Sequence, residues 1–481
     1  MPRASVVPNR ILVPLIVACA LFMENLDSTV ISTALPTIAH DFGTSPIHLK
    51  LALTSYLLTI AIFLPASGWL ADRFGARLIF RMAIIIFTFG SILCGFSTSI
   101  AAIVFARFIQ GIGGAMMVPV GRLVVLRTVE KHELVGSLAW LTVPALIGPV
   151  IGPPVGGFII TYVDWPWIFW INIPVGILGL TLATLFIPDV RGEERVNFDR
   201  LGFVLSGAGL ASFMAGATTL GLNLLPLPLT VVLIAIGTAL LVGYVLHSRR
   251  ITNPILDLSL LSIPTFRHSL TGALLFRIGM GATPFLLPLL LQIGFGMTPF
   301  RSGLITFASA IGAIAMKFVA PPVLRRFGFR NVLVANTFIA AAFVALPSLF
   351  TVETPVALMT GLLLIGGFFR SLQFTSINAL SYADISPLRM SRATTLTSVA
   401  QQISLSVGVS VGAVVLETTT RFTGGTITAS DFFVPFIVVG TISLASLIPF
   451  GRLAQDAGQE MSGHRRDRAV PDPVTVMRER S

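Results

Sequence analysis

The chain has 481 residues, of which 54% are hydrophobic and only 11% are charged, whereas a soluble globular domain has roughly 45–50% apolar and about 25% charged residues. This composition excludes an ordinary soluble enzyme. The formal charge of +11 would suggest nucleic-acid binding in a soluble protein, but here Lys and Arg lie in short segments between apolar blocks, so we expect no nucleic-acid partner.

Apolar blocks of about twenty residues, the length that crosses a hydrocarbon core as a helix, recur along the chain. They predict an all-α polytopic membrane protein with 14 transmembrane helices. In chain order the predicted helices cover residues 12–35, 49–71, 78–96, 101–126, 134–162, 168–187, 201–222, 227–246, 270–293, 302–323, 332–349, 356–382, 393–417 and 432–450.

The basic residues predict the orientation of these helices. When the connecting segments are assigned alternately to two sides, 25 of the 32 Lys and Arg residues fall on one side. Cytoplasmic loops collect Lys and Arg, so both termini are predicted to be cytoplasmic, in a multi-pass protein of the bacterial inner membrane. The other side has Lys50, Arg301 and Arg421, and the cations within helices are Arg107, Arg277, Lys317 and Arg370.

Two motifs occur twice, eight predicted helices apart. The string LADRFGARL follows the second helix and VLRRFGFRN the tenth, while R-x-x-Q occurs in the fourth helix (Arg107, Gln110) and in the twelfth (Arg370, Gln373). Short basic turns also recur by chance, but the shared offset favours parallel repeats. The predicted units are a six-helix bundle (1–200), two inserted helices (201–250), a second six-helix bundle (251–451) and a disordered basic cytoplasmic tail (452–481).

The string GWLADRFGARLIF forms the short connection after the second predicted helix. Gly75 allows a tight turn, and Asp72 can accept hydrogen bonds from an arginine or a helix N-terminus. Gly68, Arg73 and Arg77 complete the motif. A solvated basic loop is the alternative interpretation.

The fifth predicted helix is rich in glycine and proline. Glycines four residues apart form a smooth groove for another helix, and prolines bend a helix. Packing alone also explains such a helix. The residues are Gly148, Pro149, Gly152, Pro153, Gly156 and Gly157.

These motifs resemble those of the major facilitator superfamily. GWLADRFGARLIF is similar to the family's loop between its second and third helices, ARFIQGIGGAMMVPVGR to its R-x-x-Q-G motif, and IGPVIGPPVGGFI to the helix that marks its antiporters. The resemblance implies a major facilitator fold with two bundles. It also implies that Arg107 takes part in proton coupling, and that the loop and the glycine-proline helix act in conformational gating.

Three further strings, LDSTVISTALPTIA, WPWIFWINIPVGI and NPILDLSLLSIPTF, resemble the fourteen-span drug:proton antiporters of that superfamily. LPASGWLADRFG, GGAMMVPVGRL and LQIGFGMTPFRSG look like its MdtD-like branch, whose members are named as multidrug transporters largely by homology. The chain departs from the family pattern in having Arg325 where the first repeat has Asp72, Glu24 one turn before Asp27, and three cations inside the second bundle.

Glu24 and Asp27 lie three residues apart in the first predicted helix, so their side chains lie in neighbouring sectors of one face. Acids at membrane depth are costly and are kept for a function by default. An exchanger needs a site that holds either a proton or the substrate. We therefore assign proton coupling to Glu24, Asp27 and Arg107, the alternative being an acid permanently neutralised by an intramembrane arginine.

The second predicted bundle would make the central cavity electropositive, which attracts anionic or zwitterionic substrates. A different possibility pairs Arg277 with Glu24 as a latch between the bundles. The predicted cavity residues are Arg277, Lys317, Arg370, Gln110, Gln292, Gln373 and Asn378.

The predicted function is a proton-coupled efflux antiporter of small amphipathic or anionic compounds that works by alternating access. The alternative is a proton symporter or facilitator of organic acids, such as citrate-like anions. The six His residues lie at or beyond the helix ends and no G-x-x-x-x-G-K-[ST] motif occurs, so we expect no enzyme, no metal and no cofactor, with the proton gradient as the energy source. A sensor that does not transport is a further possibility, but the sequence predicts no folded soluble output domain for it. The expected partners are the substrate, protons and the lipid bilayer, with the chain acting as a monomer.

Overall fold

The structure is a computed structural model of the chain, and it describes residues 9–128, 147–148, 151–188, 198–219, 225–386 and 389–459. Every regular element among these residues is helical. The α-helices are α1 (Asn9–Asp41), α2 (Lys50–Phe74), α3 (Ala76–Gly95), α4 (Ile100–Thr128), α6 (Trp167–Trp170), α7 (Asn172–Phe186), α8 (Arg200–Thr219), α9 (Leu227–Ser248), α10 (Pro264–Leu289), α11 (Pro299–Phe327), α12 (Phe329–Ala345), α13 (Val356–Leu380), α14 (Met390–Thr423), α15 (Phe433–Leu444) and α16 (Leu447–Gly451). Residues 151–162 are also helical, and the short elements are η2 (Leu258–Ser262), η3 (Leu290–Gly294), η4 (Leu346–Leu349) and η6 (Ala429–Phe432).

The described residues contain 13 helical stretches that are long and apolar enough to cross a membrane. They confirm the predicted all-α polytopic class, and each matches one predicted helix to within a few residues. The remaining predicted helix, over 134–162, is described only in part, because residues 129–146 and 149–150 lie outside the described residues. The largest shifts are of six residues. Helix α10 begins at Pro264 rather than at Leu270, since proline is well suited to the first helical turn, while α1 ends at Asp41 rather than at Leu35 and α14 ends at Thr423 rather than at Glu417.

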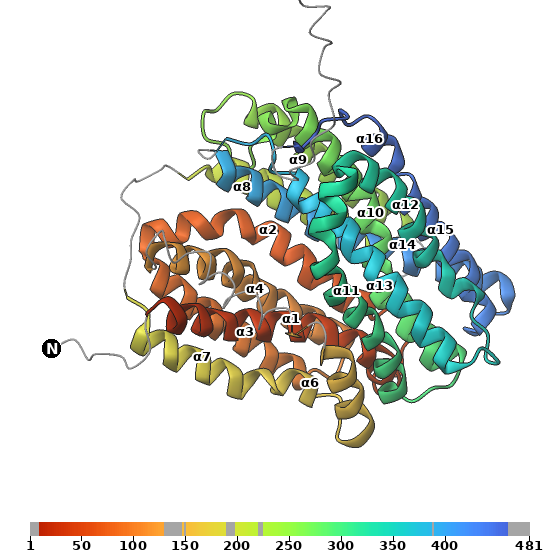
Figure 1. Cartoon of the computed structure of the whole chain (residues 1–481). Coiled ribbons are helices and arrows are strands. Elements are labelled where there is room, and N and C mark those ends of the chain that lie inside the picture. Colours follow the sequence, from red (N-terminus) through yellow and green to blue (C-terminus); the bar gives the residue numbers. More distant parts are fainter. Residues whose placement is uncertain are drawn as a thin grey trace, which may run out of the picture.

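The helices form two groups with a pair between them (Figure 1). In the first group α4 packs against both α2 and α3, and in the second α11 packs against α13 and α10 against α14. Helices α8 and α9 pack against each other, and α8 also contacts α2. Figure 1 shows the two groups splayed apart at the end where α1 begins and brought together at the other end.

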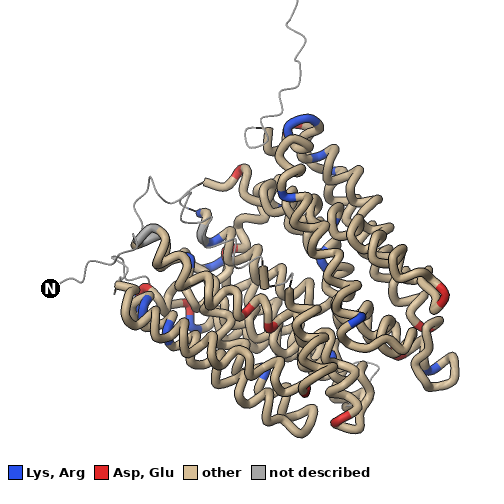
Figure 2. Tube along the Cα trace, turned by 60° about the horizontal axis from the view of Figure 1, so that its bottom comes forward, with Lys and Arg blue, Asp and Glu red and all other residues tan. Residues whose placement is uncertain are grey.

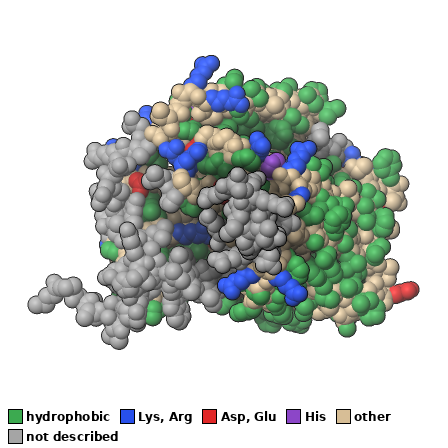
Figure 3. Space-filling model, turned by 45° about the horizontal axis from the view of Figure 1, so that its top comes forward, with side chains coloured by type: hydrophobic (Ala, Val, Ile, Leu, Met, Phe, Trp, Pro, Cys, Tyr) green, Lys and Arg blue, Asp and Glu red, His purple; other side chains and the backbone are tan. Residues whose placement is uncertain are grey.

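We call the end where α1 begins the basic end. Lys and Arg gather there (Figures 2 and 3), whereas several of the acidic residues lie deeper along the helices or at the opposite end. The described cations at helix ends on this side include Arg73, Arg249, Arg250, Arg325, Arg326, Arg389, Arg392 and Arg452. The direction in which this end faces across the membrane stays a prediction.

The two related basic turns have similar backbone geometry. Gly75 lies between α2 and α3 with φ of 99°, and Gly328 lies between α11 and α12 with φ of 72°. Each glycine amide donates to the carbonyl four residues earlier, Ala71 at 3.0 Å and Leu324 at 2.9 Å. Residues with a Cβ rarely adopt this conformation, so glycine is required at both turns.

An apolar cluster at the opposite end joins the two groups. It contains Val30 and Ile31 of α1 together with Phe285 and Leu286 of α10, all buried. Apolar side chains stabilise helix packing through the hydrophobic effect where the helices meet water, and through close van der Waals contacts where they meet lipid. In both environments this cluster holds the two groups together away from the basic end.

The predicted disordered tail needs a correction at its start. Leu453 and Ala457 are buried in the cluster that also contains Phe329 and Leu380, because these two apolar residues lie four apart and face α12 and α13. Residues 452–459 are therefore ordered. The rest of the predicted tail, 460–481, lies outside the described residues.

Candidate functional site

A cavity of about 460 Å³ lies between the two groups of helices. Its charged lining residues are Glu24 on α1, Arg107 on α4, Lys317 on α11 and Arg370 on α13. Apolar side chains from both groups, such as Leu57 and Leu405, line it as well. This size and mixed lining are typical of sites for small molecules.

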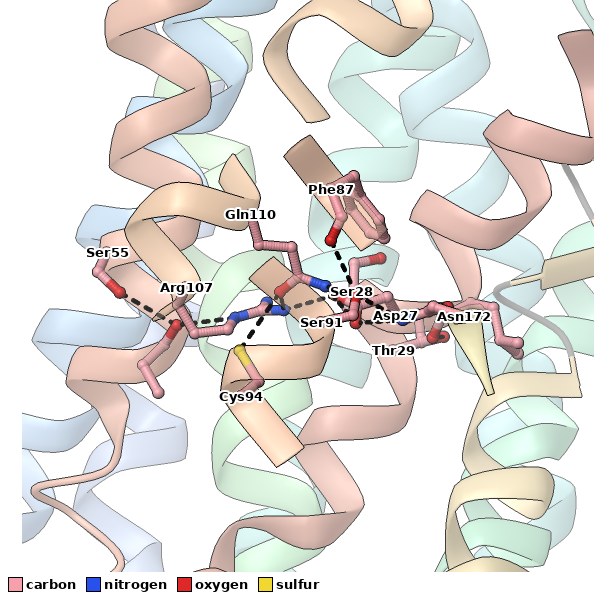
Figure 4. A network of polar contacts seen from close by, with 12 residues as sticks. Asp27, Ser28, Thr29, Ser55, Phe87, Ser91, Cys94, Arg107, Gln110 and Asn172 are labelled. Carbon is pink, nitrogen blue, oxygen red and sulfur yellow. Dashed lines mark hydrogen bonds and ion pairs between the residues drawn. The ribbon is translucent and has the colours of Figure 1, made fainter. Parts of the chain in front are cut away.

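A buried polar network lies beside this cavity (Figure 4). Arg107 Nη1 donates to Asp27 Oδ2 at 2.5 Å and to Gln110 Oε1 at 2.6 Å. Asp27 Oδ1 accepts from Gln110 Nε2 at 2.9 Å and from Asn172 Nδ2 at 3.0 Å. Both amides also donate to Ser91 Oγ, at 2.8 and 3.2 Å. The network thus joins α1, α3, α4 and α7.

Arg107 makes two further contacts on its α2 side. Its Nε donates to the carbonyl of Ala52 at 3.3 Å, and its guanidinium lies 4.1 Å from the centroid of the Tyr56 ring. The side chains of Arg107 and Asp27 are each only 1% exposed. A buried charge is tolerated when it is paired and hydrogen-bonded, so in this structure Asp27 is neutralised by Arg107, as the structural alternative proposed.

Glu24 is the acid that faces the cavity. Its Oε2 atom is buried and has no hydrogen-bond partner among the described residues. The predicted latch between Glu24 and Arg277 is wrong for this structure: Arg277 Nη2 donates to Asn378 Oδ1 at 2.7 Å, and its guanidinium lies 5.3 Å from the Phe374 ring centroid. Arg277 finds its contacts on α13, in its own group, because a neutral amide and a ring lie within its reach.

The two cations that line the cavity from the second group have no carboxylate partner among the described residues. Arg370 Nη2 is 3.4 Å from Ser309 Oγ. Lys317 is exposed to the cavity, and no ion pair involves it in the described part of the chain.

The other predicted cavity residues lie elsewhere. Arg277, Gln373 and Asn378 are not among the lining residues. Gln373 is buried, donates to Thr337 Oγ1 at 2.7 Å and accepts from Asn336 Nδ2 at 2.8 Å. A buried amide needs such contacts, and α12 supplies them.

The two remaining predicted cavity glutamines also point away from the lining. Gln110 belongs to the buried network behind the cavity wall. Gln292 Nε2 donates to the carbonyl of Thr33 at 3.0 Å, so it connects α1 with η3, which directly follows α10, across the two groups. Gln292 therefore helps to hold the opposite end together rather than lining the cavity.

The predicted gating loop lies at the basic end. Gly68 is exposed and a Cβ on it would meet nothing within 4 Å, so close packing does not require glycine there. Arg77 donates to the carbonyl of Thr184 on α7, and Arg73 is exposed while Asp72 is half-buried. The loop thus connects α2, α3 and α7 within the first group.

The fifth helix lies between the two groups. A Cβ on Gly152 would lie 2.0 Å from Thr29 Oγ1, and one on Gly156 would lie 2.7 Å from Thr33 Oγ1. Gly148 likewise faces α1, at 3.0 Å from the backbone of Leu26. The glycines four apart therefore form the predicted groove, and α1 occupies it.

The neighbouring face of this helix contacts the second group. A Cβ on Gly157 would lie 2.5 Å from the carbonyl of Pro299, and the carbonyl of Pro153 lies against Gly303. The amide of Phe300 also donates to Thr161 Oγ1 at 3.2 Å. These contacts close the opposite end, while Pro149 lies outside the described residues.

Sequence reasoning missed several residues of the site. Asn172 and Ser91 complete the network, and a polar residue inside the motif WPWIFWINIPVGI was an available signal. The other signal was helical spacing, since polar residues repeat along α1 at intervals of three and four. The missed polar residues lining the cavity are Asn25, Ser28, Thr29, Ser32, Thr283, Thr306, Ser309, Gln401 and Gln402.

Comparisons with known proteins agree with this architecture. The family model of the Major Facilitator Superfamily matches residues 17–266 and 269–476. The solved structure of a variant of the nucleoside transporter NupG has a TM-score of 0.64 and covers 92% of this chain and 99% of its own, at 12% sequence identity. This likeness supports the fold alone.

Curated relatives carry the provisional name multidrug resistance protein MdtD. The one from Pectobacterium atrosepticum is 41% identical over 405 residues, which cover 83% of this chain and 86% of the relative. The one from Salmonella paratyphi B is 38% identical over 466 residues, covering 95% and 97%. With matches of this extent, the chain belongs to the major facilitator superfamily of membrane transporters and is an MdtD-like member of it.

Proposed function

We propose that this chain is a proton-coupled efflux antiporter of small amphipathic compounds, working as a monomer in the bacterial inner membrane with its basic end in the cytoplasm. The observation that supports it most directly is the cavity between the two groups, where Glu24 presents a buried carboxylate oxygen that has no hydrogen-bond partner in the described part of the chain. The names of the MdtD relatives support export of drugs.

The coupling would depend on competition at the first-group acids. A carboxylate at membrane depth is costly when it is ionised and unpaired, so Glu24 is stabilised either by a proton or by a substrate group. Asp27 already has Arg107 as its counter-ion. We therefore propose that Glu24 exchanges proton and substrate, and that the Asp27–Arg107 pair rearranges when the two groups rock.

Alternating access requires that one end opens as the other closes. The contacts of Gly157 with Pro299 and of Gln292 with Thr33 hold the opposite end closed. Breaking them would let the groups separate there. Such a motion would expose the same cavity to the other side of the membrane.

Transport into proteoliposomes under an imposed pH gradient tests this proposal. We expect substrate to move against the direction of the protons, and Glu24→Gln and Asp27→Asn to abolish gradient-driven movement. Glu24→Asp, which keeps the carboxylate, serves as the matched control. Gradient-driven flux that is unchanged in both neutral variants would contradict the proposal.

The cations of the second group favour one alternative, a proton symporter or facilitator of organic acids. Lys317 and Arg370 line the cavity without a carboxylate partner among the described residues. The same proteoliposomes separate the two functions, because parallel movement of protons and an organic anion supports symport and excludes exchange.

A further inference from the structure

The ionic groups of the cavity are divided between its two walls. The first-group wall has Glu24 and also Arg107, whose charge is neutralised by Asp27 at 2.5 Å. The second-group wall has Lys317 on α11 and Arg370 on α13. A substrate that satisfied both walls would carry a positive group toward α1 and a negative group toward α11 and α13.

The sign of the coupling restricts the substrate further. When Glu24 binds a proton, the cavity becomes more positive by one charge, and a purely anionic substrate then binds more tightly. Protons and such an anion would bind together, which produces symport. Exchange through Glu24 needs a substrate whose own cationic group competes with the proton for that carboxylate.

The cationic wall serves a different part of the substrate. Arg370 and Lys317 have donors available for an acidic group, and Ser309 lies beside Arg370 at 3.4 Å. An arginine binds a carboxylate through two parallel hydrogen bonds. A substrate with an amine alone would meet two uncompensated positive charges here.

The lining also contains apolar side chains from both groups. Leu53, Leu57 and Ile60 on α2 and Leu287 on α10 contribute to it. An apolar spacer between the two ionic groups of a substrate would contact these side chains.

We propose that the substrates are zwitterions, with an amine that binds Glu24, a carboxylate that binds Lys317 and Arg370, and an apolar spacer. This inference rests on the proposed function for the direction of coupling, but it makes a statement about binding that holds at zero gradient. The proposed substrates differ from lipophilic cations, which have no group for the second-group wall, and from simple anions, which have no group for Glu24.

Equilibrium binding to the purified full chain tests the inference with two matched trios. The first is ε-aminocaproate, caproate and hexylamine, and the second is phenylalanine, phenylpropionate and phenethylamine. Isothermal titration calorimetry should give the zwitterion of at least one trio an affinity about tenfold higher than either analogue, since each wall then meets its opposite charge.

The pH dependence gives an independent readout between about pH 6 and pH 8, where the carboxylates and the amines of both trios stay ionised. Zwitterion affinity should fall as the pH falls, because protons compete with the amine at Glu24, whereas caproate affinity should rise. Glu24→Gln should remove both slopes and the preference for the amine, and Glu24→Asp should keep them.

Variants of the other wall complete the test. Lys317→Gln with Arg370→Gln should lower the affinity for the zwitterion and for caproate equally, and should leave hexylamine binding unchanged or stronger. The inference is overturned if the deaminated acid binds as tightly as the zwitterion in both trios, or if neither zwitterion binds. If the chain prefers zwitterions but shows no gradient-driven exchange, the proposed substrate class stands and the proposed antiport is wrong.

Discussion

The two halves of the molecule use the same R-x-x-Q motif for different purposes. In the first half Arg107 and Gln110 both bond Asp27 and are fully buried. In the second half Gln373 bonds α12 and Arg370 faces the cavity. The presence of one acid on α1 decides the difference: it draws the arginine and glutamine into a closed network, whereas without an acid the arginine keeps its charge available for a ligand.

We expect the largest difference between the two halves when Asp27 is replaced. In Asp27→Asn, Arg107 becomes a buried charge without a counter-ion, so we expect a loss of stability of about 3–5 kcal/mol and no gradient-driven exchange. Thermal unfolding in detergent and proteoliposome transport would measure these effects. The double variant Asp27→Asn with Arg107→Gln should recover part of the stability without recovering exchange. A stability loss no larger than that of Arg370→Gln would show that the pair is unimportant.

Replacing Arg107 and Arg370 separately by lysine tests whether the two arginines have different roles. Lysine lacks the planar group that lets Arg107 contact Asp27, Gln110 and the Tyr56 ring together, so Arg107→Lys should lose about 2–3 kcal/mol of stability. Arg370→Lys disrupts no such network, because the contact of Arg370 is with Ser309 Oγ at 3.4 Å, so its loss of stability should stay below about 1 kcal/mol. Equal losses in the two variants would contradict the assignment.

The two glutamines should differ in function more than in stability. Gln110→Leu and Gln373→Leu each leave buried polar groups unsatisfied, which costs about 1–3 kcal/mol. Only Gln110→Leu should also lower the exchange rate, because only Gln110 contacts Asp27. Initial transport rates at matched protein amounts would detect the difference, and an equal fall in both would argue that the second-half network also takes part in coupling.

An acid added beside Arg370 should neutralise this arginine, as Asp27 neutralises Arg107 in the first half. Ser309→Asp places a carboxylate beside Arg370, where Ser309 Oγ now lies at 3.4 Å. The new acid would neutralise Arg370, so caproate affinity should fall roughly tenfold, about 1.4 kcal/mol. Ser309→Asn is the uncharged control and should bind normally. Unchanged binding in Ser309→Asp would mean that Arg370 does not receive the anion.

The smallest effect is expected at an acid outside the membrane-spanning helices. Burial alone would raise the pKa of Asp257, but hydrogen bonds from Ser259 and Arg389 and the charge of Arg389 lower it overall. An acid with a lowered pKa in the folded state adds stability at neutral pH, and this is lost as the pH falls below about 4.

Asp257→Asn should therefore lower stability by at most about 1 kcal/mol at neutral pH, because the arginines that pair with Asp257 are well exposed. Thermal unfolding at pH 7 and at pH 4 should differ less in the variant than in the wild type. A variant with the full wild-type acid dependence would contradict this role.

Helix positions and the family were predictable because their signals are local. About twenty apolar residues make a transmembrane helix whatever its neighbours are, and Gly75 or Gly328 marks a turn that only glycine adopts readily. The predicted start of α10 and the predicted disorder of residues 452–459 were less accurate. Their boundaries depend on a proline start and on packing against α12 and α13, which hydropathy does not report.

The site was predictable in its residue types and much less in its contacts. Sequence indicated that Glu24, Asp27, Arg107, Lys317 and Arg370 are unusual at membrane depth. It did not reveal that Arg277 binds Asn378 or that Gln292 donates to Thr33. Those choices depend on which side chains lie within about 3 Å after the helices pack.

The class of the molecule, an all-helical membrane transporter with a duplicated motif and ionisable residues in its helices, follows from the order of its residues, because hydropathy and helical spacing act within single segments. The pairing of the charges, in contrast, follows from the packed helices. Asp27 and Arg107 are 80 residues apart, and whether an intramembrane charge is paired or faces a cavity depends on the packing of helices that are distant in the chain.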